Sequence, residues 1–188
     1  MKNRNEFSQC AERYIARLRK EGRYSTAHVY QNALNSFTGF CGTVHVPFQR
    51  ITRECLRHYG QYLYGCGLKP NTVSTYMRML RSIYNRGVDA GSAPYIPHLF
   101  RDVYTGVDVR QKKALPVGDL HKLLYEDPGS ERLRRTQTIA ALMFQFCGMS
   151  YAAFAHLEKT ALEQNILHYN RVKTKTPMCI EVLDTAKE

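Results

Sequence analysis

The chain contains no tryptophan, no CxxC pair and no cluster of histidines. Its six cysteines are scattered, at Cys10, Cys41, Cys55, Cys66, Cys147 and Cys179. Structural zinc sites draw on closely spaced cysteine and histidine ligands, so we expect no metal and no cofactor. Most of these cysteines lie in apolar helical settings, which is typical of free thiols in a reducing compartment.

Long apolar runs are also lacking, and we see neither a signal peptide nor a lipidation motif, so we expect no membrane partner. Acidic residues are few: 16 Asp+Glu stand against 27 Lys+Arg, for a net charge of +11 and a pI of about 9.5. Residues 1–110 hold 16 Lys+Arg against 7 Asp+Glu, whereas residues 111–188 hold 11 against 9. An excess of this kind is the electrostatic signature of a nucleic-acid-binding protein.

The most informative segment runs from Leu68 to Arg86 and predicts one helix. Pro70 marks its start, with Asn71 or Thr72 as the N-cap, and Gly87 marks its end. Apolar residues recur at the helical period, and basic or polar residues occupy the other faces. Two interpretations remain open for this helix: a solvated amphipathic helix, or a helix that binds a polyanion. The apolar stripe comprises Val73, Tyr76, Met77, Leu80, Ile83 and Tyr84.

Three further helices are predicted before it, so residues 10–90 read as a compact helical bundle. We expect Ser25 to cap the second helix and Gly42 to end it, and we expect Thr52 to cap the third. From residue 91 to residue 113, prolines and glycines break the period, which indicates a connector. Leu99 and Phe100 are apolar, so part of this connector is expected to pack.

The second half mixes helices with strands. Residues 117–125 predict a short helix, and residues 131–146 predict a longer one that is nearly all apolar after Thr138 and that we expect to be a core helix. A further short helix is expected over 151–157. The period then changes to two, so residues 165–173 and 177–183 predict a β-hairpin with basic residues near its tip. A lone hairpin is marginally stable, and we expect an exposed apolar patch on this half.

Taken together, these segments resemble bacterial tyrosine recombinases, the phage integrase family. The matching stretches are GRYSTAHVYQNALNSFTGF, ITRECLRHYGQYL, LKPNTVSTYMRMLRSIYNRGVDAG, KKALPVGDLHKLL, FQFCGMSYAAFAHL and NILHYNRVKTKTPMCIEVL. The resemblance implies a mainly α fold: a four- to five-helix SAM-like bundle, followed by an incomplete α+β catalytic domain with a β-hairpin. It places the SAM-like core-binding domain at residues 1–110, with a connector from about 91, and the first part of a truncated catalytic domain at 111–188.

The resemblance also implies a partner, double-stranded DNA held in a C-shaped clamp, and a bacterial, nucleoid-associated cytoplasmic protein. An intact recombinase or a second copy of the chain would assemble beside it on DNA. Several of the implied contacts have a structural alternative, because Ser25 and Asn71 fit helix caps equally well and a tyrosine in the position of Tyr30 is more often a core residue. The DNA contacts implied are Arg23, Ser25, Thr26, Tyr30, Lys69, Asn71, Thr72, Thr75, Arg78, Arg81, Lys112, Lys113 and Lys175.

Members of the family cleave DNA without a metal, through a tyrosine nucleophile, two arginines, a histidine and a hairpin lysine. Lys173 matches the hairpin lysine, although Lys175 stands where the motif has glycine. The first arginine position is occupied by Cys147 or Ser150, and Ala153 stands near the position of an acidic residue. No HxxR and no nucleophilic tyrosine follow the hairpin, so the resemblance implies a chain that does not cleave DNA.

Two alternatives remain open at this stage. The chain could be an active strand-transfer enzyme whose missing residues lie elsewhere, or a helical module that binds protein. The excess of Lys and Arg in residues 1–110 disfavours the second of these.

Overall fold

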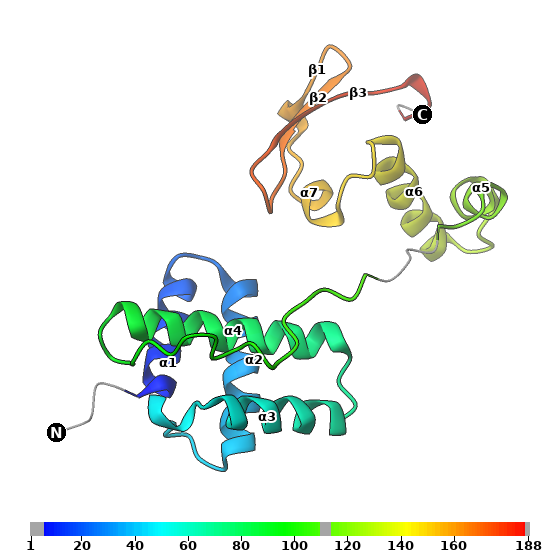
Figure 1. Cartoon of the computed structure of the whole chain (residues 1–188). Coiled ribbons are helices and arrows are strands. Elements are labelled where there is room, and N and C mark those ends of the chain that lie inside the picture. The colour runs from blue at the N-terminus through cyan, green and yellow to red at the C-terminus, as the bar shows by residue number, and fades with distance from the viewer. Residues whose placement is uncertain (1–5, 110–113, 187–188) are drawn as a thin grey trace. The chain divides into compact units, whose positions relative to one another are not determined.

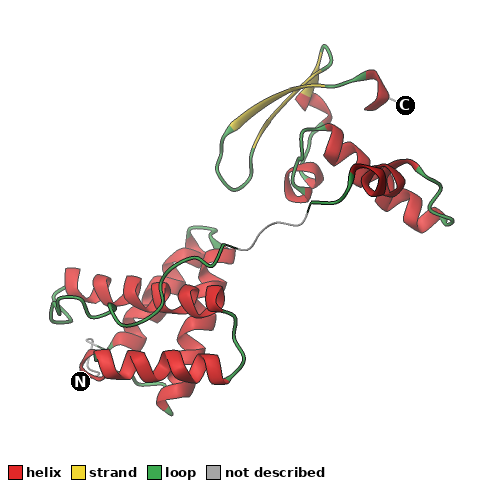
Figure 2. Ribbon diagram, turned by 45° about the vertical axis from the view of Figure 1, so that its right-hand side comes forward, coloured by secondary structure: helices red, strands yellow, loops and turns green. Residues whose placement is uncertain are grey.

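Four helices build the N-terminal part of the chain, as the sequence predicts: α1 (Phe7–Lys20), α2 (Tyr24–Cys41), α3 (Arg53–Gly65) and α4 (Pro70–Asp89). The computed structural model describes residues 6–109 and 114–186, shown in Figure 1. The chain divides into two units, Met1–Gln111 and Lys112–Glu188, and each is described by itself. The expected mainly α fold is confirmed: among the described residues, helices dominate and all three strands lie in the second unit (Figure 2).

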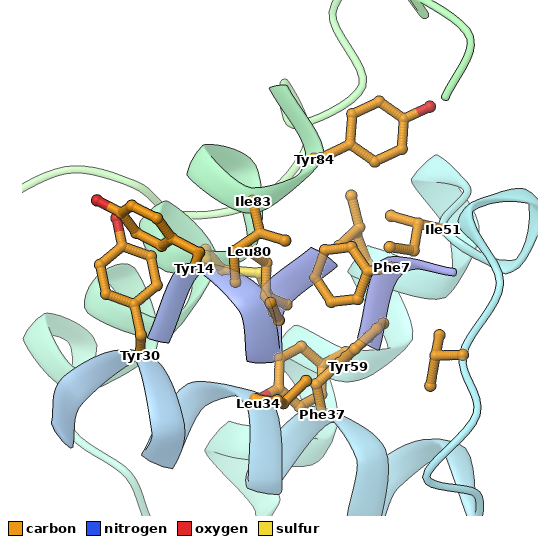
Figure 3. Packing of buried hydrophobic residues seen from close by; sticks show 14 of the residues in the cluster. Phe7, Tyr14, Tyr30, Leu34, Phe37, Ile51, Tyr59, Leu80, Ile83 and Tyr84 are labelled. Atoms are coloured by element: carbon orange, nitrogen blue, oxygen red, sulfur yellow. The ribbon is translucent and has the colours of Figure 1, made fainter. Parts of the chain in front are cut away.

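The core of the first unit is aromatic (Figure 3). Phe7 packs edge-on against Phe37 and against Phe48, with ring centroids 5.8 Å apart in both pairs. Tyr59 is fully buried, 5.0 Å from Phe37, and its hydroxyl donates a hydrogen bond to Ser36 Oγ at 2.9 Å. Burial raises the pKa of Tyr59. A buried tyrosine whose hydroxyl is satisfied adds apolar area without an unpaired polar group.

Some predicted helix boundaries are confirmed and others are wrong. Gly42 ends α2 in the left-handed conformation, and Thr52 caps α3 by accepting a hydrogen bond from Cys55 N. Ser25 does not cap α2, whose N-cap is Arg23. The N-cap of α4 is Lys69 rather than Asn71 or Thr72, because Pro70 already occupies the first turn and the chain enters from Lys69 in an extended conformation.

Gly87 does not end α4, which continues to Asp89. Gly87 is buried inside the helix, and a Cβ at this position would lie 2.3 Å from Phe48 Cζ. The glycine therefore serves the close approach of the Phe48 ring to α4. The left-handed residue that follows the helix is Gly91, with φ 66°.

The segment after α4, residues 93–108, folds back along that helix, and we call it the strap. Tyr84 Oη donates to Pro94 O at 2.9 Å, and Ser74 Oγ donates to Gly106 O at 2.5 Å. Leu99 and Phe100 join the core of the bundle, which confirms that part of the predicted connector packs. The strap thus covers one side of α4 and adds Leu99 and Phe100 to the core of the first unit.

The second unit contains α5 (Val117–Tyr125), α6 (Glu131–Gln145) and α7 (Tyr151–Ala155). The expectation that α6 is a buried core helix is wrong, because none of its residues is buried. Its apolar side chains, Phe144 among them at 51% exposure, lie at the surface or are half-buried. This unit therefore exposes the apolar surface that the sequence predicts.

The sheet has three antiparallel strands in the order β1 (Leu162–Glu163), β2 (Ile166–Asn170) and β3 (Pro177–Glu181). The predicted hairpin is β2–β3, with Leu167 opposite Ile180, and β1 is a short addition that the sequence analysis did not predict. Side chains from one face of the sheet pack on the residues around the end of α6 and on α7. This small core consists of Phe146, Met149, Ala153, Leu167, Ile180 and Val182.

Candidate nucleic-acid interface

The polar side of α4 carries the strongest concentration of candidate residues. With 3.6 residues per turn, positions 75, 78, 82, 85 and 86 share one face, opposite the buried residues Val73 and Leu80. Arg81 lies at one border of this face and is exposed. We call Thr75, Arg78, Arg81, Ser82, Asn85 and Arg86 the α4 face. A shallow hollow on it is lined by Arg78, Arg81, Ser82, Asn85, Arg86 and Asp89.

The three arginines of the α4 face have no acidic partner within 4.0 Å among the described residues, whereas Arg17 and Arg23 both pair with Glu21. The Nε atoms of Arg78 and Arg86 are buried and have no hydrogen-bond partner within the described chain. Leaving a buried donor unpaired is costly, so such groups normally serve a ligand or pack under a constraint. The α4 face thus presents positive charge that the fold does not neutralise.

Tyr30, one of the DNA contacts implied by the sequence, lies in the core instead. It is 6% exposed, it packs edge-on against Tyr14 with 4.9 Å between centroids (Figure 3), and its hydroxyl donates to Ser82 Oγ at 2.9 Å. Burial raises the pKa of Tyr30. Its role is to attach α2 to α4, so we leave it out of the interface.

The side chain of Asn71 forms hydrogen bonds with the backbone of the strap. Its Nδ2 donates to Asp108 O at 2.9 Å, and its Oδ1 accepts from Asp108 N at 2.8 Å. Thr75 Oγ1 donates to Asn71 O at 2.7 Å, so this hydroxyl satisfies the helix backbone. Lys69 and Thr72 are exposed at the same end of α4 and stay predicted contacts.

The start of α2 offers a second group. Arg23 and Ser25 are exposed and Thr26 is half-buried. No side chain caps this helix, so backbone N–H groups of its first turn lack the side-chain acceptor that an N-cap usually supplies. A helix start of this kind favours an anion, because the N–H groups and the positive end of the helix dipole face it.

In the second unit, Lys173 and Lys175 lie in the turn between β2 and β3, both exposed. Lys175 is left-handed, with φ 57°, and Arg171 N donates to Thr176 O at 2.8 Å to close the turn. The motif glycine that Lys175 replaces would adopt that conformation at a lower cost. Lys112 and Lys113 lie outside the described residues.

The position of the first arginine has a structural use in this chain. Ser150 caps α7 by accepting a hydrogen bond from Ala153 N at 3.3 Å, and Cys147 is an exposed, left-handed residue with φ 55°. Ala153 is buried in the small core. Val172, next to Lys173, lines the same hollow as Ala153. Among the described residues, no hydrogen bond or ion pair joins Lys173 to Cys147 or Ser150.

Sequence reasoning overlooked Arg17 and Arg86 as candidate contacts; both lie against the ring of Tyr14. Tyr14 looked like a plain core residue, yet Arg86 lies over its ring, with Cζ 3.8 Å from the centroid, and Arg17 lies 5.0 Å from the same centroid. The available signal was the arginine at every fourth position of α1, at residues 13 and 17, beside a tyrosine. Only the packing of α1 against α4 shows that Arg17 and Arg86 lie beside the same ring.

Over the described residues, no group of three or more His, Cys, Asp and Glu side chains has the arrangement of a metal site. In that same part of the chain, each helix is either too short or too polar to cross a bilayer.

Known proteins identify the architecture. Residues 6–98 match the family of the phage integrase SAM-like domain. The sequence has no significant match among curated proteins. Two solved structures are similar in fold, both of the Tn1549 transposon integrase in complex with a circular intermediate DNA, with TM-scores of 0.67 and 0.65. Each is 13% identical to this chain and covers 94% of it, whereas the chain spans 57% of each integrase chain.

The match to the integrase domain lies on the four-helix bundle and the start of the strap, the same elements that carry the α4 face. The integrase structures extend the likeness in fold to nearly the whole chain. Residues 6–98 thus form a SAM-like domain of the phage integrase family, and the chain shares the fold of these integrase structures.

Proposed function

We propose that this chain binds double-stranded DNA through the α4 face and takes part in site-specific recombination or integration. The observation that carries the proposal is the set of three arginines on one side of α4, with no acidic partner among the described residues, on a helix whose opposite side is core. Arginine forms paired hydrogen bonds to phosphates and to guanine edges, and a helix fits the major groove. The DNA in the two similar integrase structures supports the same function for this chain.

Two further groups extend the proposed contact. Arg23, Ser25 and Thr26 surround the uncapped start of α2, where a backbone phosphate would meet free N–H groups. Lys69 and Thr72 would add contacts at the start of α4. Lys173 and Lys175 at the hairpin tip would contact DNA from the second unit, and we propose residues 1–110 and 111–188 as the two domains of the family. Lys112 and Lys113 stay predicted contacts on sequence grounds alone.

Salt dependence tests this proposal most directly. Each phosphate contact releases condensed counterions, so the logarithm of the binding constant is expected to fall linearly with the logarithm of salt concentration. With four or more phosphate contacts, we expect a slope of about −3.6 or steeper in a fluorescence-anisotropy titration with duplex DNA. An affinity that does not change between low and high salt would contradict DNA binding.

We further propose that the chain is catalytically incomplete. Cys147 and Ser150 hold the positions of the first arginine, and neither carries a permanent charge. Removing one preorganised donor to a developing oxyanion costs about 10²- to 10³-fold in rate. The chain would then compete with an intact recombinase, or assemble beside one or beside a second copy of itself, on DNA in the bacterial nucleoid.

A suicide DNA substrate, which traps the covalent phosphotyrosyl intermediate, tests this second statement. We expect no covalent protein–DNA adduct from the unaltered chain. An adduct formed by Cys147→Arg, but not by a matched Cys66→Arg variant at another exposed cysteine, would place the defect at the missing charge. An adduct formed by the unaltered chain would overturn the proposed incompleteness and favour the active strand-transfer enzyme.

A further inference from the structure

Two arginines from different helices lie against one tyrosine ring at the junction of α1 and α4. Arg86 of α4 lies over the ring of Tyr14 at 3.8 Å, and Arg17 of α1 lies 5.0 Å from the same centroid. A hollow at this place is lined by Cys10, Arg13, Tyr14, Arg17, Arg86, Asp89 and Ala90. Three of its seven lining residues are arginines, and one is acidic.

The platform beneath Arg86 is fixed. Tyr14 is 9% exposed and packs edge-on against Tyr30, whose hydroxyl donates to Ser82 one turn before Arg86. The guanidinium is planar, so stacking on the ring restricts its rotation and points its N–H edges along the ring plane. Arg86 Nε is buried without a partner in the described chain. The side chain is therefore ordered before any ligand binds, which lowers the entropy lost on binding.

The electrostatic balance of the hollow favours an anion. Bringing like charges together costs energy, and here the only acid in the lining is Asp89. Arg17 also pairs with Glu21 at 3.6 Å, but both side chains are about half exposed, so this pair contributes little and can be exchanged. A bound anion would relieve the repulsion between the guanidinium groups.

The hollow is continuous with the α4 face. Arg86 and Asp89 line both this hollow and the one that contains Arg78 and Arg81. Arg78 and Arg86 are eight residues apart, about 12 Å along the helix. The two hollows thus lie side by side on α4, at a distance that the backbone of one duplex can bridge.

We propose that the hollow between α1 and α4 is a phosphate subsite of the DNA interface. Arg86 and Arg17 bind the phosphodiester, and Tyr14 is the platform that orients them. This inference rests on the proposed DNA binding, and it adds α1 to the elements that contact the duplex. Because a backbone phosphate is the ligand, the subsite contributes affinity for every DNA sequence and no base preference.

The experiment compares Arg86→Gln, Arg17→Gln and the control Arg57→Gln in the full chain, by anisotropy titrations over a range of salt. Arg57 is an exposed arginine of α3 outside both hollows. Loss of one phosphate contact is expected to make the salt slope shallower by about 0.9 and to weaken binding about fivefold at 0.15 M salt, equally for all duplexes. Arg57→Gln is expected to leave the slope unchanged.

Two additional variants test the stacked guanidinium of Arg86 and the ion pairs of Glu21. Arg86→Lys keeps the charge but loses the planar stack, so we expect the salt slope to stay and the affinity to fall less than in Arg86→Gln. Glu21→Gln frees Arg17 and Arg23 from their pair and is expected to tighten binding. Thermal unfolding of each variant identifies any that fails to fold.

Slopes for Arg86→Gln and Arg17→Gln equal to that of Arg57→Gln would overturn the subsite. If Arg78→Gln still made the slope shallower in that case, DNA binding through the α4 face would stand without the subsite. If no arginine variant changed the slope, the proposed function itself would fail.

Discussion

The double variant Arg78→Gln/Arg81→Gln is expected to bind duplex DNA about 30-fold more weakly than the unaltered chain at 0.15 M salt. Each lost phosphate contact reduces the binding constant about fivefold at that salt concentration, and the salt slope becomes shallower by about 1.8. Both arginines lie on the α4 face and lack an acidic partner among the described residues, so their charge is directed to a ligand. Anisotropy titrations at three or more salt concentrations give both quantities.

A matched control removes the same net charge elsewhere. Arg134→Gln/Arg135→Gln deletes two adjacent arginines of α6, which pair with Asp127 and Glu131. If only net charge mattered, both double variants would weaken binding equally, and the assignment to the α4 face would be wrong. If Arg78 or Arg81 reads a base edge, its variant should also relax the preference at one position of the site, whereas a phosphate contact weakens all sequences alike.

Gly87→Ala is expected to destabilise the bundle by about 1–3 kcal/mol, although alanine is the better helix former. The added methyl would lie 2.3 and 2.5 Å from ring atoms of Phe48, which is itself 1% exposed and cannot move into solvent. Phe48 also contacts Phe7 and Tyr84 edge-on, so a shift of the ring disturbs both pairs. Urea unfolding followed by far-ultraviolet circular dichroism measures the loss.

The same substitution elsewhere is expected to have the opposite sign. Gly39 lies inside α2, and a Cβ there meets nothing within 4 Å, so Gly39→Ala should stabilise the bundle by about 0.5–1 kcal/mol. A Gly87→Ala variant as stable as the unaltered chain would show that the Phe48 ring does not pack against α4. The chain has two units, which can unfold in separate transitions. The stabilities of the two variants are therefore compared in the unfolding transition of the first unit, which contains both Gly39 and Gly87.

Periodicity was the reliable signal along the chain. The apolar spacing within residues 7–86 predicted four helices, and all four form, because each has a stripe wide enough to bury against the others. The same reasoning failed for α6. Apolar composition predicts burial only if a partner surface exists, and none of the residues of α6 is buried among the described residues.

Helix ends were less predictable, because several residues can satisfy the same backbone groups. Thr52 caps α3 as expected, but Ser25 is not the N-cap of α2 and Asn71 is not the N-cap of α4. Asn71 bonds the backbone of Asp108, 37 residues away, and Gly87 sits against Phe48. Neither partner can be inferred from neighbouring residues, since both depend on how distant segments pack.

By itself, the sequence determined the helical class, the excess of positive charge in the first 110 residues and the alignment of Arg78 and Arg81 on one side of a helix. These properties follow from composition and from a period of 3.6 residues, which need no partner. Only the tertiary structure decided that Tyr30 lies in the core, that the strap occupies Asn71, and that Arg17 and Arg86 share the ring of Tyr14. Those outcomes join residues separated by tens of positions, and the packing of the bundle alone brings them within contact distance.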